Sequence, residues 1–155
     1  MVNEFQGMKL LILGGMRISC EIIHKAKSMG IYTIVADYNK IEDSPGKKIA
    51  DEHFLVSTID VDEIVKLIKE QEINGVMVGF NDFMLPYYAE ICKKSGLPSY
   101  GTKEQFDIFT NKGIYKKLCR KYNVPTVEEY SINQILNGKL DDFRRVPVLV
   151  KPTDS

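Results

Sequence analysis

A short apolar run that ends in two glycines, residues 9–15, constrains the fold of this chain more than any other feature. It reads Lys-Leu-Leu-Ile-Leu-Gly-Gly and shows no alternation of polar and apolar residues. Continuous apolar character is typical of a parallel strand that is buried on both faces, and glycines allow a tight turn after it. Apolar residues from Ile18 to Met29 then recur at helical spacing, and Gly30 can end that helix in a left-handed conformation. The segment therefore predicts a strand, a tight turn and a helix.

Strand-like and helical segments continue to alternate after this unit. The strand-like segments are apolar or β-branched runs, and the helical segments carry apolar side chains on one face. They are residues 31–37, 54–56 and 74–80 for the strands, and residues 60–71 and 85–95 for the helices. A short last strand is expected around residues 98–101, with further helices that begin near Thr102 and Asn111. This alternation predicts an α/β fold: a Rossmann-like open parallel sheet of strand order 3-2-1-4-5, covered by helices on both faces.

A domain boundary is expected near Val124. The helix that begins near Asn111 should stop at Asn123, which tolerates the left-handed conformation, and Pro125 blocks any continuation. We therefore assign residues 7–124 to the first domain and residues 125–155 to the start of a second. The second part holds a strand candidate at 126–132 and an apolar strand at 146–150. Chains below about 40 residues rarely bury enough surface to fold alone, so we expect this sequence to be a fragment with an incomplete second domain.

Composition and charge narrow the classes of partner. The chain has 21 lysine and arginine residues and 21 aspartate and glutamate residues. With no net charge, no long-range electrostatic field favours binding to nucleic acid or to an anionic membrane. The apolar runs are far shorter than the roughly 20 residues of a membrane-spanning helix, and the first residues do not resemble a signal peptide. A cytoplasmic protein with a local binding site is expected. Cys20, Cys92 and Cys119 are widely spaced on predicted helices, which favours free, buried thiols.

The residues that follow the first and fourth predicted strands form the candidate binding site. In a sheet of this strand order the winding reverses between those two strands, and ligands bind at their carboxyl ends. Glycines there allow close approach of a ligand, arginine can hold an anion, and asparagine and aspartate can accept hydrogen bonds. The candidates for substrate binding are Gly14, Gly15, Met16, Arg17, Asn81 and Asp82.

Asp37 supports an alternative interpretation. It ends the second predicted strand, where a nicotinamide-dinucleotide-binding domain places the acid that holds a ribose. The turn after Gly14 and Gly15, however, lacks the third glycine of the G-x-G-x-x-G motif. There is no P-loop or paired zinc-ligand spacing, and neither His24 nor His53 has a suitably spaced metal-binding partner, so no metal site is predicted.

Two lysine motifs carry a resemblance to a known family. The sequence contains "TNKGIYKKLCRKYNVPT", with Lys112, and "VPVLVKPTDS" further on, with Lys151. The pair resembles the entry into an ATP-grasp domain, and the whole chain resembles the amino-terminal pre-ATP-grasp domain found in biotin carboxylase and the carbamoyl phosphate synthetase large subunit. The resemblance implies that residues 125–155 open an α+β ATP-grasp domain. It also implies that Lys112 and Lys151 both contact ATP.

The resemblance further implies a ligase that uses ATP and Mg²⁺. Such enzymes phosphorylate a small-molecule carboxylate and let an amine or a thiol attack the acyl phosphate. The catalytic and magnesium-binding residues would lie beyond Ser155, so the chain alone should be inactive. Asn111 departs from the family, whose members often carry an acidic residue before the lysine, and the likeness to D-Ala ligases is weaker. A homodimer and a non-catalytic interaction module, paired through the strand around Val148, remain open alternatives.

Overall fold

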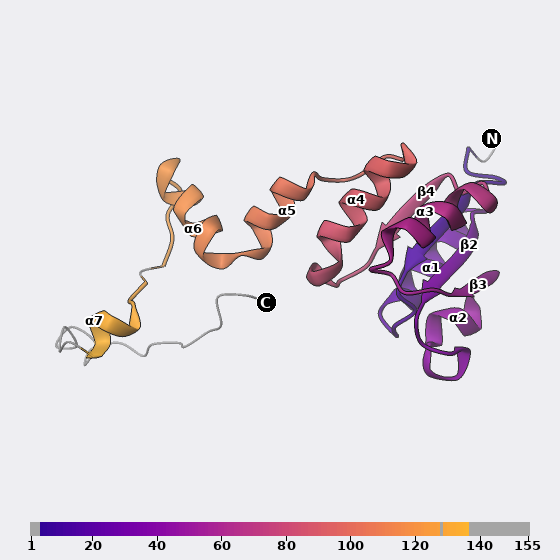
Figure 1. The fold of residues 1–155 in the computed structure, drawn as a ribbon, viewed down its shortest axis with the longest axis horizontal. Coiled ribbons are helices and arrows are strands. Elements are labelled where there is room, and N and C mark those ends of the chain that lie inside the picture. The colour runs from indigo at the N-terminus through magenta and orange to yellow at the C-terminus, as the bar shows by residue number, and fades with distance from the viewer. Residues whose placement is uncertain (1–3, 128, 137–155) are drawn as a thin grey trace. The chain divides into compact units, whose positions relative to one another are not determined.

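The computed structural model describes residues 4–127 and 129–136, which fall into two compact units, Met1–Phe106 and Asp107–Ser155. The first unit alternates strands and helices along the chain, as Figure 1 shows. Its elements are β1 (Lys9–Leu13), α1 (Ser19–Ser28), β2 (Tyr32–Asp37), η1 (Ile41–Asp43), α2 (Pro45–Ile49), β3 (Glu52–Leu55), α3 (Val61–Glu70), β4 (Gly75–Val78), η2 (Asp82–Met84) and α4 (Leu85–Ser95). Helix α5 (Lys103–Thr110) begins in this unit and continues into the second, which also contains α6 (Lys112–Lys121) and α7 (Ile132–Leu136).

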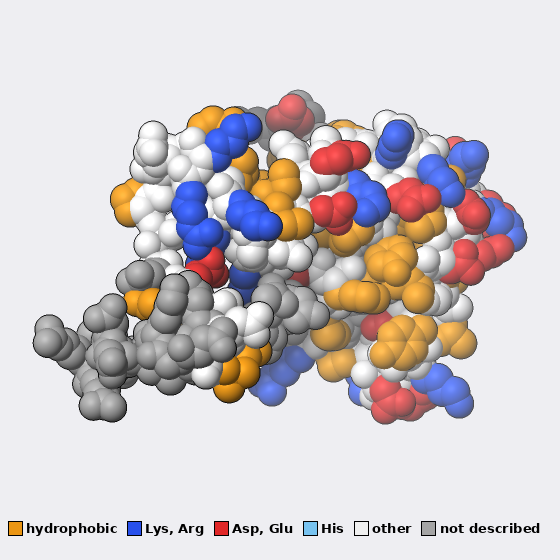
Figure 2. Space-filling view, turned by 60° about the vertical axis from the view of Figure 1, so that its left-hand side comes forward, with side chains coloured by type: hydrophobic (Ala, Val, Ile, Leu, Met, Phe, Trp, Pro, Cys, Tyr) orange, Lys and Arg blue, Asp and Glu red, His pale blue; other side chains and the backbone are white. Residues whose placement is uncertain are grey.

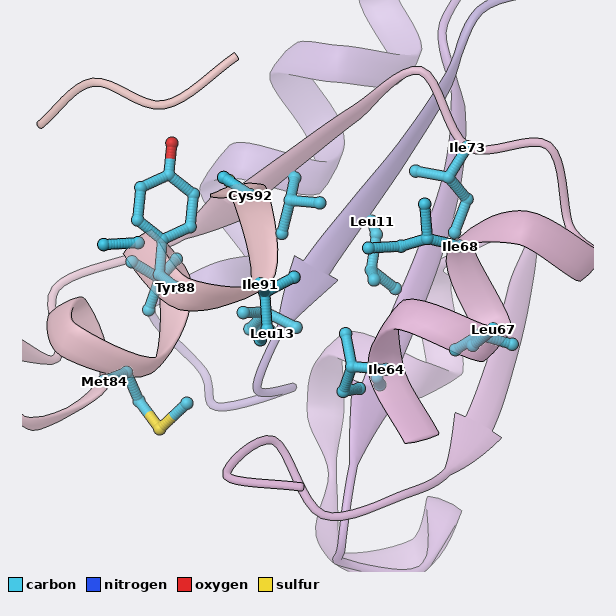
Figure 3. Packing of buried hydrophobic residues seen from close by; sticks show 14 of the residues in the cluster. Leu11, Leu13, Ile64, Leu67, Ile68, Ile73, Met84, Tyr88, Ile91 and Cys92 are labelled. Atoms are coloured by element: carbon cyan, nitrogen blue, oxygen red, sulfur yellow. The ribbon is translucent and has the colours of Figure 1, made fainter. Parts of the chain in front are cut away.

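The four strands form one parallel sheet in the order β3-β2-β1-β4. Alternate residues of the central strand β1 point to opposite faces, so a continuous apolar run is buried on both sides. Leu11 and Leu13 belong to the larger cluster, which side chains of α3 and α4 complete (Figure 3). Ile12 packs on the other face with Ile23 of α1. The predicted fold class and the order of the first four strands are confirmed.

Helix ends follow the local signals in the sequence. The Asp60 carboxylate accepts a hydrogen bond from the Glu63 amide at 3.2 Å, and the Asn111 side chain accepts one from the Ile114 amide at 3.0 Å. Gly30 and Asn123 take left-handed conformations with φ of 77° and 55°. These caps depend on residues within one helical turn, which explains why they were predictable.

The fifth strand expected around residues 98–101 is not formed, so the sheet has four strands within the described residues. Hydrogen bonds that involve side chains connect this segment to α4 and β4, in place of the backbone hydrogen bonds of a strand pair. The Tyr100 amide donates to the Tyr88 hydroxyl at 3.2 Å, and the Tyr100 hydroxyl donates to the Val78 carbonyl of β4 at 3.1 Å. The two rings stack with centroids 4.3 Å apart. Burial, followed by the nearby Tyr88, raises the pKa of Tyr100 to about 12.

The strand candidate at residues 126–132 is also wrong for the part that the structure describes. Residues 126, 127 and 129–131 form no strand, and Ile132 begins α7. Glu129 instead forms ion pairs with Lys116, at 2.9 Å, and Arg120, both on α6. An extended segment without a neighbouring strand has no ladder partner, and here its acidic side chain binds the helix before it. The apolar run at 146–150 and Lys151 lie outside the described residues.

Burial of the cysteines largely follows the prediction. Cys92 and Cys119 are buried, Cys20 is partly buried, and all three are free thiols. Burial raises the pKa of the Cys92 thiol, which keeps it protonated at neutral pH. Between residues 4 and 136, leaving out residue 128, no helix is long and apolar enough to cross a membrane.

Asp51 ties the amino-terminal end of β2 to the start of β3 and should make stability depend on acid. Its carboxylate accepts hydrogen bonds from the Thr33 amide and hydroxyl at 2.8 and 2.7 Å, and it pairs with Lys27 at 2.8 Å. Burial raises the pKa of Asp51, but the bonds from Lys27 and Thr33 outweigh it and leave the pKa below its ordinary 3.8. A carboxyl group whose pKa is lower in the folded than in the unfolded chain stabilises the fold at pH values above its unfolded pKa. This stabilisation is lost as the pH falls through the folded pKa.

We therefore expect Asp51→Asn to lower the free energy of unfolding at pH 7 by about 1 kcal/mol. The variant should also lose less stability than the wild type as the pH falls below about 4. Urea denaturation followed by circular dichroism at pH 7 and pH 3 measures both effects. Asp62→Asn is the control, because Asp62 is exposed and pairs only across the surface with Lys94. Equal pH dependence in the wild type and Asp51→Asn would contradict the prediction.

Candidate functional site

The carboxyl ends of β1 and β4 lie side by side, as the sequence predicts for the candidate site. Leu13 of β1 is paired with Val78 of β4 in a parallel register. The segments that leave these strands, 14–17 and 79–82, therefore begin at the same edge of the sheet. All six predicted substrate-binding residues belong to these two segments of the first unit.

Gly14 and Gly15 form a turn whose conformation and packing both require glycine. Gly14 has a φ of 92°, a region that side chains disfavour, and its amide donates to the Ala36 carbonyl at 2.8 Å. Gly15 is buried, and a Cβ atom there would lie 2.0 Å from the Ser44 hydroxyl oxygen. The Gly15 amide donates to the Asp37 carboxylate at 2.6 Å, and its carbonyl accepts from the Gly46 amide at 2.8 Å. The second glycine is thus explained by packing inside the protein.

Met16 and Arg17 follow the turn and are both exposed. Their carbonyls accept hydrogen bonds from the Ser19 and Cys20 amides at 2.9 and 3.1 Å, which starts α1. Residues 16 and 17 are therefore held by their backbone, while their side chains face solvent. A thioether and a guanidinium at this position can contact an apolar group and an anionic group of a ligand.

Asn81 and Asp82 lie at the start of η2, on the β4 side of the site. Asn81 is partly buried and Asp82 is exposed. The Asn81 carbonyl accepts from the Met84 amide at 3.0 Å, which closes the short helix. An amide and a carboxylate there can accept hydrogen bonds from hydroxyl or amino groups.

Large apolar side chains are exposed at or just after the carboxyl end of each strand, a feature that was not predicted from the sequence. The surface includes Met16, Tyr38, Leu55, Phe80 and Phe83, with exposed fractions from 45% for Met16 to 72% for Phe80. Exposed apolar residues that share one edge of a sheet are a common mark of a binding surface. In Figure 2, apolar side chains also gather among charged ones on the face that this view presents.

Asp37 does not have the surroundings of a ribose-binding acid. It is 3% exposed, and one carboxylate oxygen accepts from the Gly15 amide and the Ser44 hydroxyl. The other oxygen accepts from the amide and the side chain of Asn39 at 2.8 and 3.0 Å. Both oxygens are therefore occupied within the protein. The geometry does not support the nicotinamide interpretation.

Lys47 lies beside Asp37 and was not singled out from the sequence. It is 2% exposed, and its ammonium group donates to the backbone carbonyls of Asp37 and Asn39 at 2.7 and 2.5 Å. Burial lowers the pKa of Lys47, and the charge of Asp37 partly opposes that change. The only signal in the sequence was the neighbouring Ser-Pro-Gly stretch, residues 44–46, which indicates a tight backbone but not a buried lysine.

The structure describes only one of the two lysines that are predicted to contact ATP. Lys112 is the first residue of α6, directly after the cap residue Asn111, in the second unit. Lys151 lies outside the described residues, so the convergence of the two lysines stays a prediction. His24 and His53 are exposed. In the described part of the chain no three His, Cys, Asp or Glu side chains are grouped to hold a metal ion.

Comparisons with known proteins agree with this fold. No model of a protein family matches the sequence. The chain is 27% identical over 129 residues to the 2-oxoglutarate carboxylase small subunit of Hydrogenobacter thermophilus, which covers 77% of this chain and 27% of that protein. It is 27% identical over 153 residues to a phosphoribosylamine–glycine ligase of Methanocorpusculum labreanum, which covers 94% and 34%.

A solved structure extends the similarity to three dimensions. It is the biotin carboxylase domain dimer of the Hydrogenobacter thermophilus 2-oxoglutarate carboxylase, in complex with MgADP, ADP and bicarbonate. The TM-score is 0.65 at 26% identity, over 77% of this chain and 28% of that one. The chain thus spans about a third or less of the length of the relatives it matches. In strand order, in the glycine turn after β1 and in sequence, the chain is similar to the amino-terminal, pre-ATP-grasp domains of ATP-grasp enzymes.

Proposed function

We propose that the protein carrying this domain is an ATP-dependent ligase that joins a carboxylate to an amine, similar to the carbamoyl phosphate synthetase large subunit. The observation that carries the proposal is the similarity along 94% of the chain to a phosphoribosylamine–glycine ligase, a name that states a carboxylate and an amine. The segments that follow β1 and β4 support it, because Arg17, Asn81 and Asp82 there carry groups that can bind a small polar substrate.

The proposed reaction has two steps. A carboxylate oxygen attacks the γ-phosphorus of ATP, and ADP leaves, so the carboxylate becomes an acyl phosphate. The amine nitrogen then attacks the acyl carbon, the carbon–oxygen bond to phosphate breaks, and the amine loses a proton. Catalysis of this type depends mainly on positioning and on neutralising phosphoryl charge. A thiol in place of the amine would give the thioester by the same steps.

The residues of this chain take two roles in the proposal. The segments after β1 and β4 hold the acceptor substrate, and the two lysines hold the nucleotide. The acceptor set is Gly14, Gly15, Met16, Arg17, Asn81 and Asp82, and the ATP set is Lys112 and Lys151. The Gly15 backbone is bonded inside the protein and does not bind the ligand itself. Its proposed role is to form the turn that brings Met16 and Arg17 close to the ligand.

The position of Lys112 supports a role with an anion. A positive charge at the first position of a helix is unfavourable, because the helix dipole is positive at that end. A bound triphosphate would be stabilised by the lysine and by the dipole together.

Magnesium has no ligands that we assign in this part of the chain. Mg²⁺ prefers carboxylate and other oxygen ligands together with substrate phosphates, and the described residues form no such acidic group. Residues 125–155 are proposed as the start of the ATP-grasp domain, after a boundary near Val124.

Lys112→Met tests the proposal in the complete ligase. We expect the variant to lower kcat/KM for ATP by about 100-fold, because one cation at the phosphates is lost. Lys117→Met is the control, since Lys117 is an exposed residue of the same helix. ADP release is measured with a panel of carboxylates and amines. Equal kcat/KM for ATP in the two variants would reject the role of Lys112.

Residues 1–155 alone are expected to bind ATP only weakly, because most of the nucleotide cleft would lie in the rest of the ATP-grasp domain. Isothermal titration calorimetry with Mg-ATP should show no binding in the micromolar range. Micromolar affinity would contradict the assignment of residues 125–155 as an incomplete domain. Thermal denaturation with and without NAD tests the alternative in which Asp37 holds the ribose of a nicotinamide dinucleotide. We expect no thermal stabilisation by NAD.

A further inference from the structure

A buried polar network lies directly beneath the Gly14–Gly15 turn. The Gly15 amide donates to the Asp37 carboxylate at 2.6 Å, and Ser44 contributes bonds to the same carboxylate oxygen and to the Gly15 carbonyl at 3.2 and 3.3 Å. The Gly46 amide donates to the Gly15 carbonyl at 2.8 Å. Gly46 is packed so closely that a Cβ atom there would lie 2.9 Å from the Gly15 Cα atom. The peptide groups on both sides of Gly15 are therefore bonded to Asp37, the last residue of β2, and to the segment that follows β2.

The network continues on the other side of Asp37. The second carboxylate oxygen accepts from the Asn39 amide and side chain, and Lys47 donates to the Asp37 and Asn39 carbonyls. Asp37, Ser44 and Lys47 are all buried. A buried carboxylate that accepts several hydrogen bonds, beside a buried cation, forms a rigid support, because any movement would leave a charged group unpaired.

Met16 and Arg17 are exposed to solvent, whereas both amides of the turn and the Gly15 carbonyl are bonded inside the protein. The Gly14 amide is bonded to the Ala36 carbonyl, and both polar atoms of Gly15 are bonded within the protein. The direction in which Met16 leaves the turn depends on the plane of the peptide that joins it to Gly15. The bonds to the Gly15 carbonyl, from Gly46 and Ser44, set that plane. Asp37 fixes the preceding peptide, between Gly14 and Gly15, through the Gly15 amide, and it also bonds the Ser44 hydroxyl.

We propose that Asp37 is a positioning residue of the acceptor-substrate site: its buried carboxylate orients the Gly15 backbone and so aims Met16 and Arg17 toward the edge between β1 and β4. The substrate part of this inference rests on the proposed function. The role differs from ribose binding, since the carboxylate meets the protein backbone and not the ligand.

Only a carboxylate fits the network, which makes the substitution by asparagine informative. One oxygen of Asp37 faces the Gly15 amide and the other faces the Asn39 amide, so backbone donors lie on both sides. An asparagine at position 37 would point its NH₂ group at one of these donors in either orientation. Asp37→Asn therefore removes one backbone hydrogen bond and adds a donor–donor contact without changing the size of the side chain.

Asp51→Asn is the matched control. It is the same substitution, and Asp51 also accepts a backbone amide of β2, that of Thr33, at 2.8 Å. Asp51 lies next to the start of β3, at the opposite end of the sheet from the glycine turn. A general loss of stability would appear in both variants, whereas a change at the glycine turn should appear only in Asp37→Asn.

The first measurement is backbone amide NMR on the isotope-labelled chain of residues 1–155. In Asp37→Asn we expect the amide signals of Gly15, Met16 and Arg17 to move and the hydrogen exchange of Gly15 to speed up at least about tenfold. In Asp51→Asn these signals should stay in place. Ser44→Ala, which removes a single hydroxyl from the network, should move the same signals less and serves if Asp37→Asn does not fold. Unchanged signals in both network variants would overturn the positioning role.

The second measurement separates KM from kcat in the complete ligase. Asp37→Asn should raise KM for the acceptor carboxylate about tenfold or more, with kcat and KM for ATP changed less than about threefold. An unchanged acceptor KM, or an equal rise in Asp51→Asn, would overturn the inference. If the wild-type protein turns over no carboxylate, the proposed function fails instead, and the amide signals alone decide whether Asp37 positions the turn.

Discussion

Replacing Gly15 with alanine is expected to lower the free energy of unfolding by about 2 to 3 kcal/mol, in the range measured for overpacked cores. The added Cβ atom would lie 2.0 Å from the Ser44 hydroxyl oxygen, 3.2 Å from a Val35 methyl group and 3.3 Å from the Asp37 carboxylate. The Ser44 side chain would have to turn away and lose its bonds to Gly15 and Asp37. Urea denaturation monitored by circular dichroism measures the loss.

The double variant Gly15→Ala with Ser44→Ala tests the cause of this loss. Removing the hydroxyl oxygen removes the closest contact, so the two substitutions together should cost about 1 kcal/mol less than the sum of the single ones. Gly75→Ala is the control in β4, because a Cβ atom there meets only Leu10, at an ordinary 3.6 Å. It should cost little or nothing. Additive effects of Gly15→Ala and Ser44→Ala would show that their contact is not the source of the strain.

Replacing Lys47 with methionine is expected to lower the free energy of unfolding by about 2 to 4 kcal/mol. The substitution keeps most of the volume but leaves the Asp37 and Asn39 carbonyls without their donor and the Asp37 carboxylate without its neighbouring cation. Each unsatisfied buried acceptor costs about 1 to 3 kcal/mol. Lys48→Met is the matched control, since the adjacent Lys48 is exposed and binds only the Glu42 carbonyl, and it should cost less than about 0.5 kcal/mol.

The pH dependence of the same pair gives a second readout. Because burial lowers the pKa of Lys47 in the folded protein below its ordinary 10.5, the unfolded chain binds more protons in the interval between the two values. Stability from this group therefore rises with pH through that interval, and Lys47→Met lacks the rise. The stability difference between the wild type and Lys47→Met should grow as the pH approaches 10.5. A difference that shrinks as the pH rises would contradict the lowered pKa of Lys47 in the folded protein.

Much of the first unit was predictable because its signals are local or periodic. The apolar run of β1 and the glycines after it predicted a doubly buried strand and a tight turn, and both are present. The fifth strand was predicted wrongly, since Pro98 to Gly101 looks like a strand and turn. Its backbone instead meets the Tyr88 hydroxyl, and the Tyr100 hydroxyl meets the Val78 carbonyl. Side-chain bonds across 12 and 22 residues leave no periodic mark in the sequence.

The candidate site shows the same division. The six substrate-binding candidates lie at one edge of the sheet as predicted, because strand ends in a parallel sheet meet there, a rule that needs only the strand order. Their role in binding stays a prediction. The sequence also marked Asp37 correctly as the end of β2, but it suggested the wrong kind of partner. Lys47 was missed, because a lysine in a polar stretch gives no sign that its ammonium group is buried against two carbonyls.

The sequence by itself determined the α/β alternation, the helix caps and the glycine turn, because each depends on residues within about one helical turn or on a simple period. The tertiary structure alone decided which groups the buried charges meet. The Gly15 amide and the Asp37 carboxylate are 22 residues apart, and only the parallel pairing of β1 with β2 brings them within 2.6 Å. Burial then decides what Asp37 binds. Its carboxylate is shielded from solvent and accepts hydrogen bonds from backbone amides on both oxygens, so it binds the protein backbone and not a ligand.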